Sequence, residues 1–222
     1  MVSKVINIKD AWVSLWNSSN GRSQIFLTGT LSIFVCYINF HYLAIWEARK
    51  GVLIDDKLLA MLTPVDFSVP IFFMMYSVVI LGLVLLLNEP EYLLKALQAY
   101  MLMLFLRTIT IFFIPLEPPV GMIMLIDPFG QLCLGKDGLV VTKDLFFSGH
   151  TGALFIYYFA TKNKWLKHYI TLCCLAVPLM LVWQHVHYTL DVIAAPFASF
   201  FCIKLVDRVY KKAGHEVVLF EE

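Results

Sequence analysis

The sequence is poor in charge. Only 15% of its 222 residues are charged and 60% are hydrophobic, whereas soluble domains contain about 25% charged and about 45–50% apolar residues. The formal net charge is +1, which provides no electrostatic attraction for a nucleic acid or an acidic partner. This composition argues against a soluble domain and indicates a protein that is embedded in a membrane.

Patterns of metal ligands and disulfides are also scarce. Only Cys133 of the five cysteines lies outside an apolar run, and no CxxC or Cys/His ligand spacing occurs. No triple His-box pattern appears, which argues against a haem or metal membrane protein, and His185-Val186-His187 alone is a weak zinc signal. We therefore expect no metal and no cofactor. Residues 1–24 are too polar for a cleavable signal peptide.

Six apolar stretches approach the length of about 20 residues that a helix needs to cross a bilayer. In chain order they run from Ile25 to Trp46, Phe67 to Leu87, Leu93 to Ile114, Leu145 to Ala160, Trp165 to Trp183 and Tyr188 to Leu205. Helices are expected because lipid cannot satisfy backbone polar groups. The fourth stretch is the shortest and begins with polar residues. The sequence predicts an all-α fold, a six-transmembrane-helix bundle in one membrane domain over residues 1–222, with its core at 25–205.

Basic residues orient this bundle. If the N-terminal segment, residues 1–24, is cytoplasmic, eleven loop lysines and arginines lie inside and five lie outside, as the positive-inside rule requires. Both termini, including the tail 206–222, are therefore expected in the cytoplasm. Val5 to Trp16 has a weak amphipathic pattern that suits a surface helix. The longest connection, Pro115 to Asp144, lies on the outer side and contains four prolines, so we expect it to be irregular.

The first candidate motif is Ser148-Gly149-His150, which opens the fourth apolar stretch. Glycine lets a backbone N–H approach a phosphate closely, and a helix N-terminus supplies further donors. Ser148 adds a hydroxyl, and His150 can protonate a leaving oxygen. An ordinary helix start with an interfacial histidine is the alternative interpretation. Asp144, just before the motif, is expected to cap this helix or to contact a cationic headgroup.

The second candidate motif is His187-Tyr188-Thr189-Leu190-Asp191. Residues four apart meet on one face of a helix, and a carboxylate on one imidazole nitrogen leaves the other free as base or nucleophile. A structural ion pair at the helix end is the alternative interpretation. Arg107 lies inside the third stretch, where a guanidinium is expected to bind a phosphate with two donors. Its alternatives are snorkelling to the headgroups or pairing with Asp191.

The predicted topology places these groups at one depth. Arg107, His150, His187 and Asp191 all fall near the outer boundary, where lipid phosphates lie. Two histidines, a carboxylate and a guanidinium can transfer a phosphoryl group without a metal, with one histidine attacking phosphorus and the other protonating the leaving alcohol.

These motifs resemble the sphingomyelin synthase family, a branch of the type-2 phosphatidic acid phosphatase superfamily. The resemblance lies in three segments, which in chain order are Leu106 to Thr110, Asp144 to Thr151 and His187 to Ala195. They fall within residues 100–200, and their order matches the order of the motifs in that family. It implies a catalytic triad in which His187, oriented by Asp191, forms a phosphohistidine and His150 is the general acid. It also implies a site on the lumenal or extracellular side of a multi-pass protein.

The resemblance implies a lipid phosphotransferase that moves a phospho-headgroup, phosphocholine or similar, from a glycerophospholipid to a lipid alcohol such as ceramide. Arg107, Ser148 and Gly149 would bind the phosphate. Candidate headgroup contacts are Asp144, His185 and Tyr188. A hydrolase that uses water as acceptor remains the alternative, and the sequence does not define the oligomeric state.

Departures from the superfamily matter here. The wider phosphatases carry a lysine where this chain has Tyr100 and an arginine where it has Leu181, which favours the synthase branch. A transporter or channel is disfavoured because the inner halves of the apolar stretches are nearly free of charge. An acyltransferase of the His-x4-Asp kind does not fit, because three residues separate His187 from Asp191.

Overall fold

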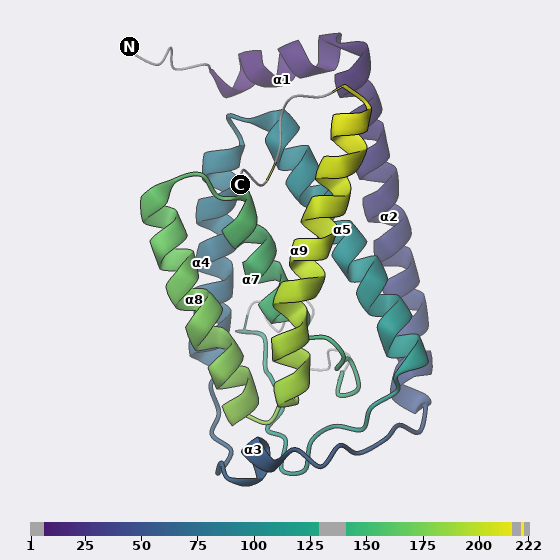
Figure 1. Ribbon diagram of the computed structural model, residues 1–222, viewed down its shortest axis with the longest axis vertical. Coiled ribbons are helices and arrows are strands. Elements are labelled where there is room, and N and C mark those ends of the chain that lie inside the picture. Colours follow the sequence, from purple (N-terminus) through teal and green to yellow (C-terminus); the bar gives the residue numbers. More distant parts are fainter. Residues whose placement is uncertain (1–6, 129–140, 215–218, 220–222) are drawn as a thin grey trace.

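The computed structural model describes residues 7–128, 141–214 and 219, and its named elements are all helices (Figure 1). Five of them are long and apolar enough to cross a membrane: α2 (Ser19–Ala48), α4 (Ser68–Leu86), α5 (Pro90–Phe113), α8 (Lys164–Trp183) and α9 (Thr189–Lys212). Each overlaps one of the predicted apolar stretches. The prediction of a helical membrane protein therefore agrees with the structure in its general form.

The remaining predicted span corresponds to α7 (Gly149–Ala160), which has 12 residues. A helix of that length is about 18 Å long, less than the hydrocarbon core of about 30 Å. The helix starts four residues later than the apolar stretch because Ser148 acts as its N-cap, accepting a hydrogen bond from Thr151 N at 3.3 Å. Among the described residues, five of the six predicted spans are thus membrane-length helices, and the sixth is the shorter α7.

The shorter helix is the centre of the bundle. α7 packs against α4, α5, α8 and α9, while α2 packs on the outside of α5 (Figure 1). Close approach between α7 and α9 is visible at Gly152, whose carbonyl accepts a hydrogen bond from Ser199 Oγ at 2.9 Å. A Cβ on Gly152 would lie 2.6 Å from Met103 Sδ of α5. A larger residue here would require the Met103 side chain to shift.

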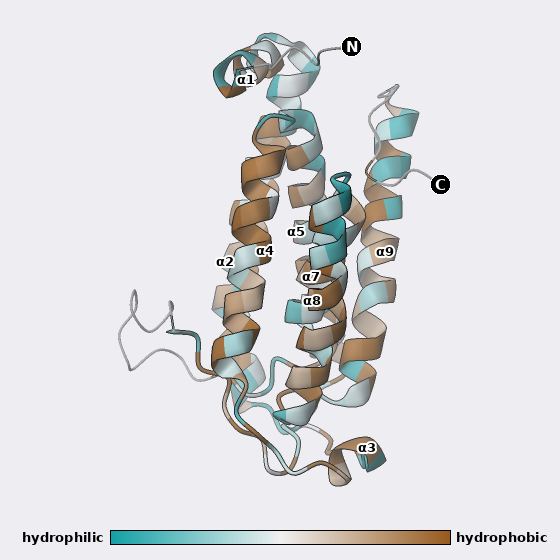
Figure 2. Ribbon diagram, turned by 90° about the vertical axis from the view of Figure 1, so that its left-hand side faces the viewer, coloured by the Kyte–Doolittle hydropathy of each residue, from teal (hydrophilic) through white to brown (hydrophobic). Residues whose placement is uncertain are grey.

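The connections divide between the two ends of the bundle. α1 (Ile8–Asn17), the α4–α5 and α7–α8 turns and the last turn of α9 lie at one end, which we call the α1 end (Figure 1). The short α3 (Lys57–Ala60), the segment after α5 and the α8–α9 connection lie at the other, the α3 end. Figure 2 shows hydrophobic residues along much of the long helices, whereas α1 carries both hydrophobic and hydrophilic residues.

α1 agrees with the amphipathic pattern, although residues 1–6 lie outside the described part of the chain. Its N-cap is Asn7, and the Trp12 indole donates to Leu87 O of the α4–α5 turn at 3.0 Å. The helix crosses the end of the bundle (Figure 1).

The long connection after α5 is irregular where it is described. Residues 114–127 and 141–148 contain no helix, and the rest of the predicted irregular segment lies outside the described residues. Val52 and Leu116 form an isolated parallel bridge, with Val52 N donating to Pro115 O at 2.9 Å. Glu117 receives a hydrogen bond from Gly51 N at 2.7 Å and pairs with Lys143 at 3.1 Å. These contacts attach the connection to the segment that follows α2.

Candidate functional site

His187 and Asp191 lie at the beginning of α9. The expectation that both sit on one helical face is wrong, because α9 starts at Thr189 and His187 precedes it. They still meet: Asp191 Oδ2 lies 3.3 Å from His187 Nδ1 and accepts a hydrogen bond from Tyr188 N at 3.0 Å. Asp191 is fully buried and His187 is 2% exposed. The Asp191 carboxylate, in the first turn of α9, thus caps this helix and orients the His187 imidazole through Nδ1. The second ring nitrogen, Nε2, is the one that could react with a substrate.

The start of α7 joins the start of α9 directly. Ser148 N donates to Asp191 O at 3.1 Å, and the Ser148 side chain is fully buried. The Ser148 amide is therefore used within the protein, while its hydroxyl oxygen accepts from Thr151 N. Of the residues proposed for phosphate contact in this motif, Gly149 is the more accessible, being half-buried.

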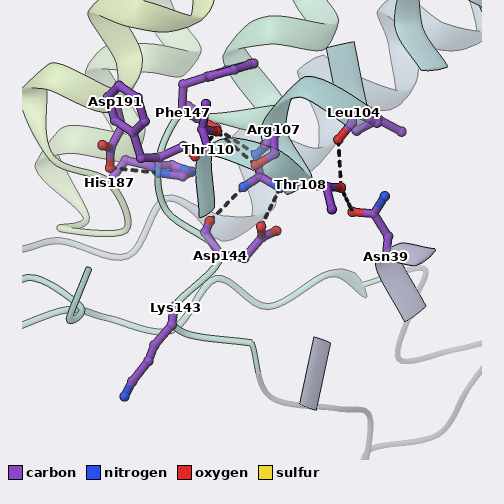
Figure 3. A network of polar contacts seen from close by, with 12 residues as sticks. Asn39, Leu104, Arg107, Thr108, Thr110, Lys143, Asp144, Phe147, His187 and Asp191 are labelled. Atoms are coloured by element: carbon purple, nitrogen blue, oxygen red, sulfur yellow. Dashed lines mark hydrogen bonds and ion pairs between the residues drawn. The ribbon is translucent and has the colours of Figure 1, made fainter. Parts of the chain in front are cut away.

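Arg107 of α5 holds the segment that leads into α7 (Figure 3). Its Nε donates to Phe147 O at 2.6 Å, its Nη2 donates to Asp144 O at 2.7 Å, and its Nη1 pairs with the Asp144 carboxylate at 2.5 Å. A guanidinium carries five N–H donors, so these contacts leave two for another acceptor. The alternative of a pair with Asp191 is not what the structure contains, since Arg107 pairs with Asp144.

Gly149 lies against the guanidinium. A Cβ at this position would be 3.2 Å from both Cζ and Nε of Arg107. The glycine therefore lets the first turn of α7 approach the guanidinium closely. Thr110 supports the same segment from α5, with its hydroxyl donating to Phe146 O at 2.9 Å.

His150 lies beside this network. It is half-buried, and its ring is edge-on to Phe72 of α4 with the ring centroids 5.8 Å apart. It follows Ser148, whose amide donates to Asp191 O, and Gly149, which lies against the Arg107 guanidinium. In Figure 3 His187 and Asp191 lie beside Arg107 and Asp144, while Lys143 points away. The structure therefore brings Arg107, His150, His187 and Asp191 together from three helices and the loop before α9.

The three candidate headgroup contacts have other partners. Asp144 pairs with Arg107, and the capping role expected for it is wrong because Ser148 caps α7. Tyr188 is 1% exposed and its hydroxyl donates to Glu117 O at 2.9 Å. The His185 Nδ1 lies 2.9 Å from Val120 O, at a backbone φ of 58°. Tyr188 and His185 thus connect the loop before α9 to the long connection.

Two polar residues that sequence reasoning missed hold the α3 end together. Asp56 caps α3 and also accepts hydrogen bonds from Thr189 N at 2.7 Å and Thr189 Oγ1 at 3.1 Å. Burial raises the pKa of Asp56, but the hydrogen bonds from Thr189, Leu59 and Leu58 outweigh it and lower the pKa below its ordinary value.

Gln184 is the second missed residue. It is fully buried, accepts from Phe67 N at 2.8 Å and donates to Ser68 Oγ at 3.1 Å and Ile123 O at 3.2 Å. The sequence feature that could have identified Gln184 is a single amide side chain at the end of an apolar stretch, because a buried amide requires hydrogen-bond partners.

The arrangement suits chemistry at a phosphorus atom. One imidazole is oriented by a buried carboxylate, and a guanidinium with two further N–H groups lies against Gly149, the residue that precedes the second imidazole in the chain. Such groups can supply a nucleophile, a general acid and a phosphate ligand. Among the described residues, no three His, Cys, Asp or Glu side chains are grouped so that they could hold a metal ion.

Comparison with known proteins gives one family. Residues 143–208 match the PAP2 superfamily C-terminal family, and this segment contains His150, His187 and Asp191. No curated protein matches the chain. The match supports the phosphatase superfamily rather than its sphingomyelin synthase branch in particular. The chain is thus similar, over α7 to α9, to a superfamily of phosphatase and phosphotransferase type, and the activity that this suggests is on lipids.

Proposed function

We propose that this protein is a membrane-embedded lipid phosphotransferase that moves a phospho-headgroup from a glycerophospholipid to a lipid alcohol such as ceramide. The single observation that carries the proposal is that the start of α7, which bears His150, lies against Arg107 and is hydrogen-bonded to Asp191, the buried carboxylate that orients His187. The site faces the lumenal or extracellular side, which the distribution of loop lysines and arginines favours.

In the first step, Nε2 of His187 attacks phosphorus and the bond from phosphorus to the diacylglycerol oxygen breaks. His150 donates its proton to that oxygen, so diacylglycerol leaves as a neutral alcohol. The imidazolium that forms on His187 is stabilised by Asp191 at Nδ1. Arg107 and the backbone of Gly149 bind the phosphoryl oxygens.

In the second step, the acceptor alcohol attacks the phosphohistidine. The P–N bond breaks, His150 takes the proton of the acceptor hydroxyl, and both histidines return to their starting state. Water in place of the alcohol would give hydrolysis by the same residues. The second candidate function is therefore a lipid phosphatase or phospholipase C-like hydrolase.

The test uses purified full-length protein with labelled choline, ethanolamine and inositol glycerophospholipids, with and without ceramide. Products that carry the headgroup on ceramide indicate transfer, and free phospho-headgroup indicates hydrolysis. We expect His187→Ala and Asp191→Ala to lower turnover at least about a hundredfold. His168→Ala is the matched control, since His168 is exposed on α8 at the α1 end and its Nδ1 contacts Lys164 O of its own helix. Wild-type turnover in the His187 variant would refute the assignment, and loss of activity in EDTA would refute metal independence.

A further inference from the structure

α2 has one buried face and one exposed face. The buried residues fall on one side at the helical repeat of 3.6 residues, and they are Gly21, Gln24, Thr28, Val35 and Trp46. The other side carries a stripe of apolar residues that are 64% to 82% exposed, namely Phe26, Ile33, Tyr37 and Phe40. Because α2 is long and apolar enough to cross a membrane, this stripe is its lipid-facing surface.

Arg22 stands at the α1 end of this stripe. It is exposed and lies four residues before Phe26, so the two side chains share one face of α2. The first turns of α2 are polar, and its apolar run begins at Ile25. The guanidinium is therefore placed at the depth of the lipid headgroups, and the Phe26 ring lies one turn deeper, toward the acyl chains.

α1 extends this surface around a corner. The ring of Trp16 lies 6.1 Å from the ring of Phe26, centroid to centroid. Lys9, Val13 and Trp16 are four and three residues apart, which places them on one face of α1. All three are exposed, Val13 to 48% and Trp16 to 49%. The lipid-facing surface of α2 thus continues onto a face of α1 that carries a second basic group.

The other sides of α1 face the protein. Leu15 is buried, and the Trp12 indole donates to Leu87 O at 3.0 Å. Asp10 and Ser14 line the space between α1 and the start of α5. Figure 1 shows α1 running across the end of the bundle while α2 runs along it. α1 is therefore oriented along the membrane surface, and its acidic side chain points to a different side from Lys9.

The corner between α1 and α2 matches an anionic phospholipid in charge and in polarity. Lys9 and Arg22 are positive, while Trp16 and Phe26 are aromatic. A guanidinium binds a phosphate with two donors, and tryptophan favours the boundary between headgroups and acyl chains. The sequence predicts that the α1 end is cytoplasmic, and the cytoplasmic leaflet is the one that contains anionic lipids.

We propose that Lys9, Trp16, Arg22 and Phe26 form a binding site for an anionic phospholipid in the leaflet at the α1 end. The negative headgroup lies at Lys9 and Arg22, and an acyl chain follows the exposed stripe of α2 from Phe26. The site is at the opposite end of the bundle from the histidines, so its lipid is bound and not turned over. This inference goes beyond the proposed function and does not depend on it.

The test measures quenching of Trp16 fluorescence in the full-length protein in phosphatidylcholine nanodiscs. A lipid brominated near its headgroup, either phosphatidylglycerol or phosphatidylcholine, is added at increasing mole fraction. The difference between wild type and Trp16→Phe isolates the Trp16 signal from the other tryptophans. We expect brominated phosphatidylglycerol to reach half-maximal quenching at a mole fraction at least about fivefold lower, which is the attraction of one basic residue to an anionic surface.

Removal of the two charges separates a site from general attraction. In Lys9→Gln/Arg22→Gln the preference for phosphatidylglycerol should fall below about twofold. Lys164→Gln/Lys211→Gln is the matched control, because it removes two exposed lysines at the same end of the bundle and should keep the preference. An equal loss in both double variants would overturn the site, as would equal quenching of the wild type by the two lipids. Turnover is not measured, so failure of the transferase proposal leaves these results unchanged.

Discussion

Arg107 offers a prediction whose size can be worked from the structure. Its guanidinium makes three contacts with residues 144–147, two to backbone carbonyls and one to a carboxylate. Arg107→Lys keeps the charge but replaces a planar fork with one point donor. An ammonium on a shorter stem can reach one of these acceptors, so two of the three contacts are lost.

Hydrogen bonds from a charged group contribute about 1.5–3 kcal/mol each, so two of them amount to about 3–6 kcal/mol. The Asp144 side chain is 32% exposed, so solvent weakens its ion pair with Arg107. We therefore take the lower end of this energy range, about 3 kcal/mol. About 3 kcal/mol corresponds to roughly a hundredfold change in an equilibrium constant. Because the contacts tie down one segment, this change should appear as local opening rather than as loss of the fold.

The assay is amide hydrogen exchange by mass spectrometry on the full chain in detergent micelles. Peptides covering residues 141–148 should exchange roughly a hundredfold faster in Arg107→Lys, while peptides from α8 keep the wild-type rate. Arg22→Lys is the matched control, since Arg22 is exposed near the start of α2. Unchanged protection of residues 141–148 in Arg107→Lys would refute the view that this guanidinium anchors the entrance to α7.

Two further predictions follow from single contacts at the α3 end. Gly149→Ala places a Cβ 3.2 Å from the Arg107 guanidinium, which must shift by a few tenths of an ångström. Turnover should fall by roughly tenfold to a hundredfold, with the melting temperature close to wild type, because small misplacements of catalytic groups are costly. Gly29→Ala, which meets nothing within 4 Å, is its control, and equal turnover in both variants would contradict the argument. The lowered pKa of Asp56 means that its stabilising effect is present above the ordinary carboxyl pKa of about 3.9 and is lost as the pH falls through the lowered pKa. The melting temperature of the wild type should therefore fall between pH 6 and pH 2, and it should fall less in Asp56→Asn. Melting temperatures that fall in parallel in the two proteins would contradict a stabilising role of the Asp56–Thr189 hydrogen bonds.

Much of this protein follows from local sequence. Five apolar stretches became membrane-length helices because hydrophobic length and backbone hydrogen bonding are properties of a segment by itself. The candidate residues Arg107, His150, His187 and Asp191 were recognisable because ionisable groups are costly at membrane depth. The Ser148-Gly149-His150 motif was recognised as a helix start, although Asp144 and not Ser148 was expected to cap it.

Tertiary structure decided what these groups touch. The His187–Asp191 contact arises from a helix that begins at Thr189 and not from a continuous helical face, because Asp56 and Tyr188 N–H determine how the chain enters α9. Asp144 became the partner of Arg107, and Asp127 came to lie against Tyr76 of α4, through packing between segments distant in sequence. Residue spacing carries no information on such contacts, since they depend on how loops at the α3 end cross one another. The sequence determined which groups can react, and the packing of α4, α5, α7 and α9 determined how they are arranged.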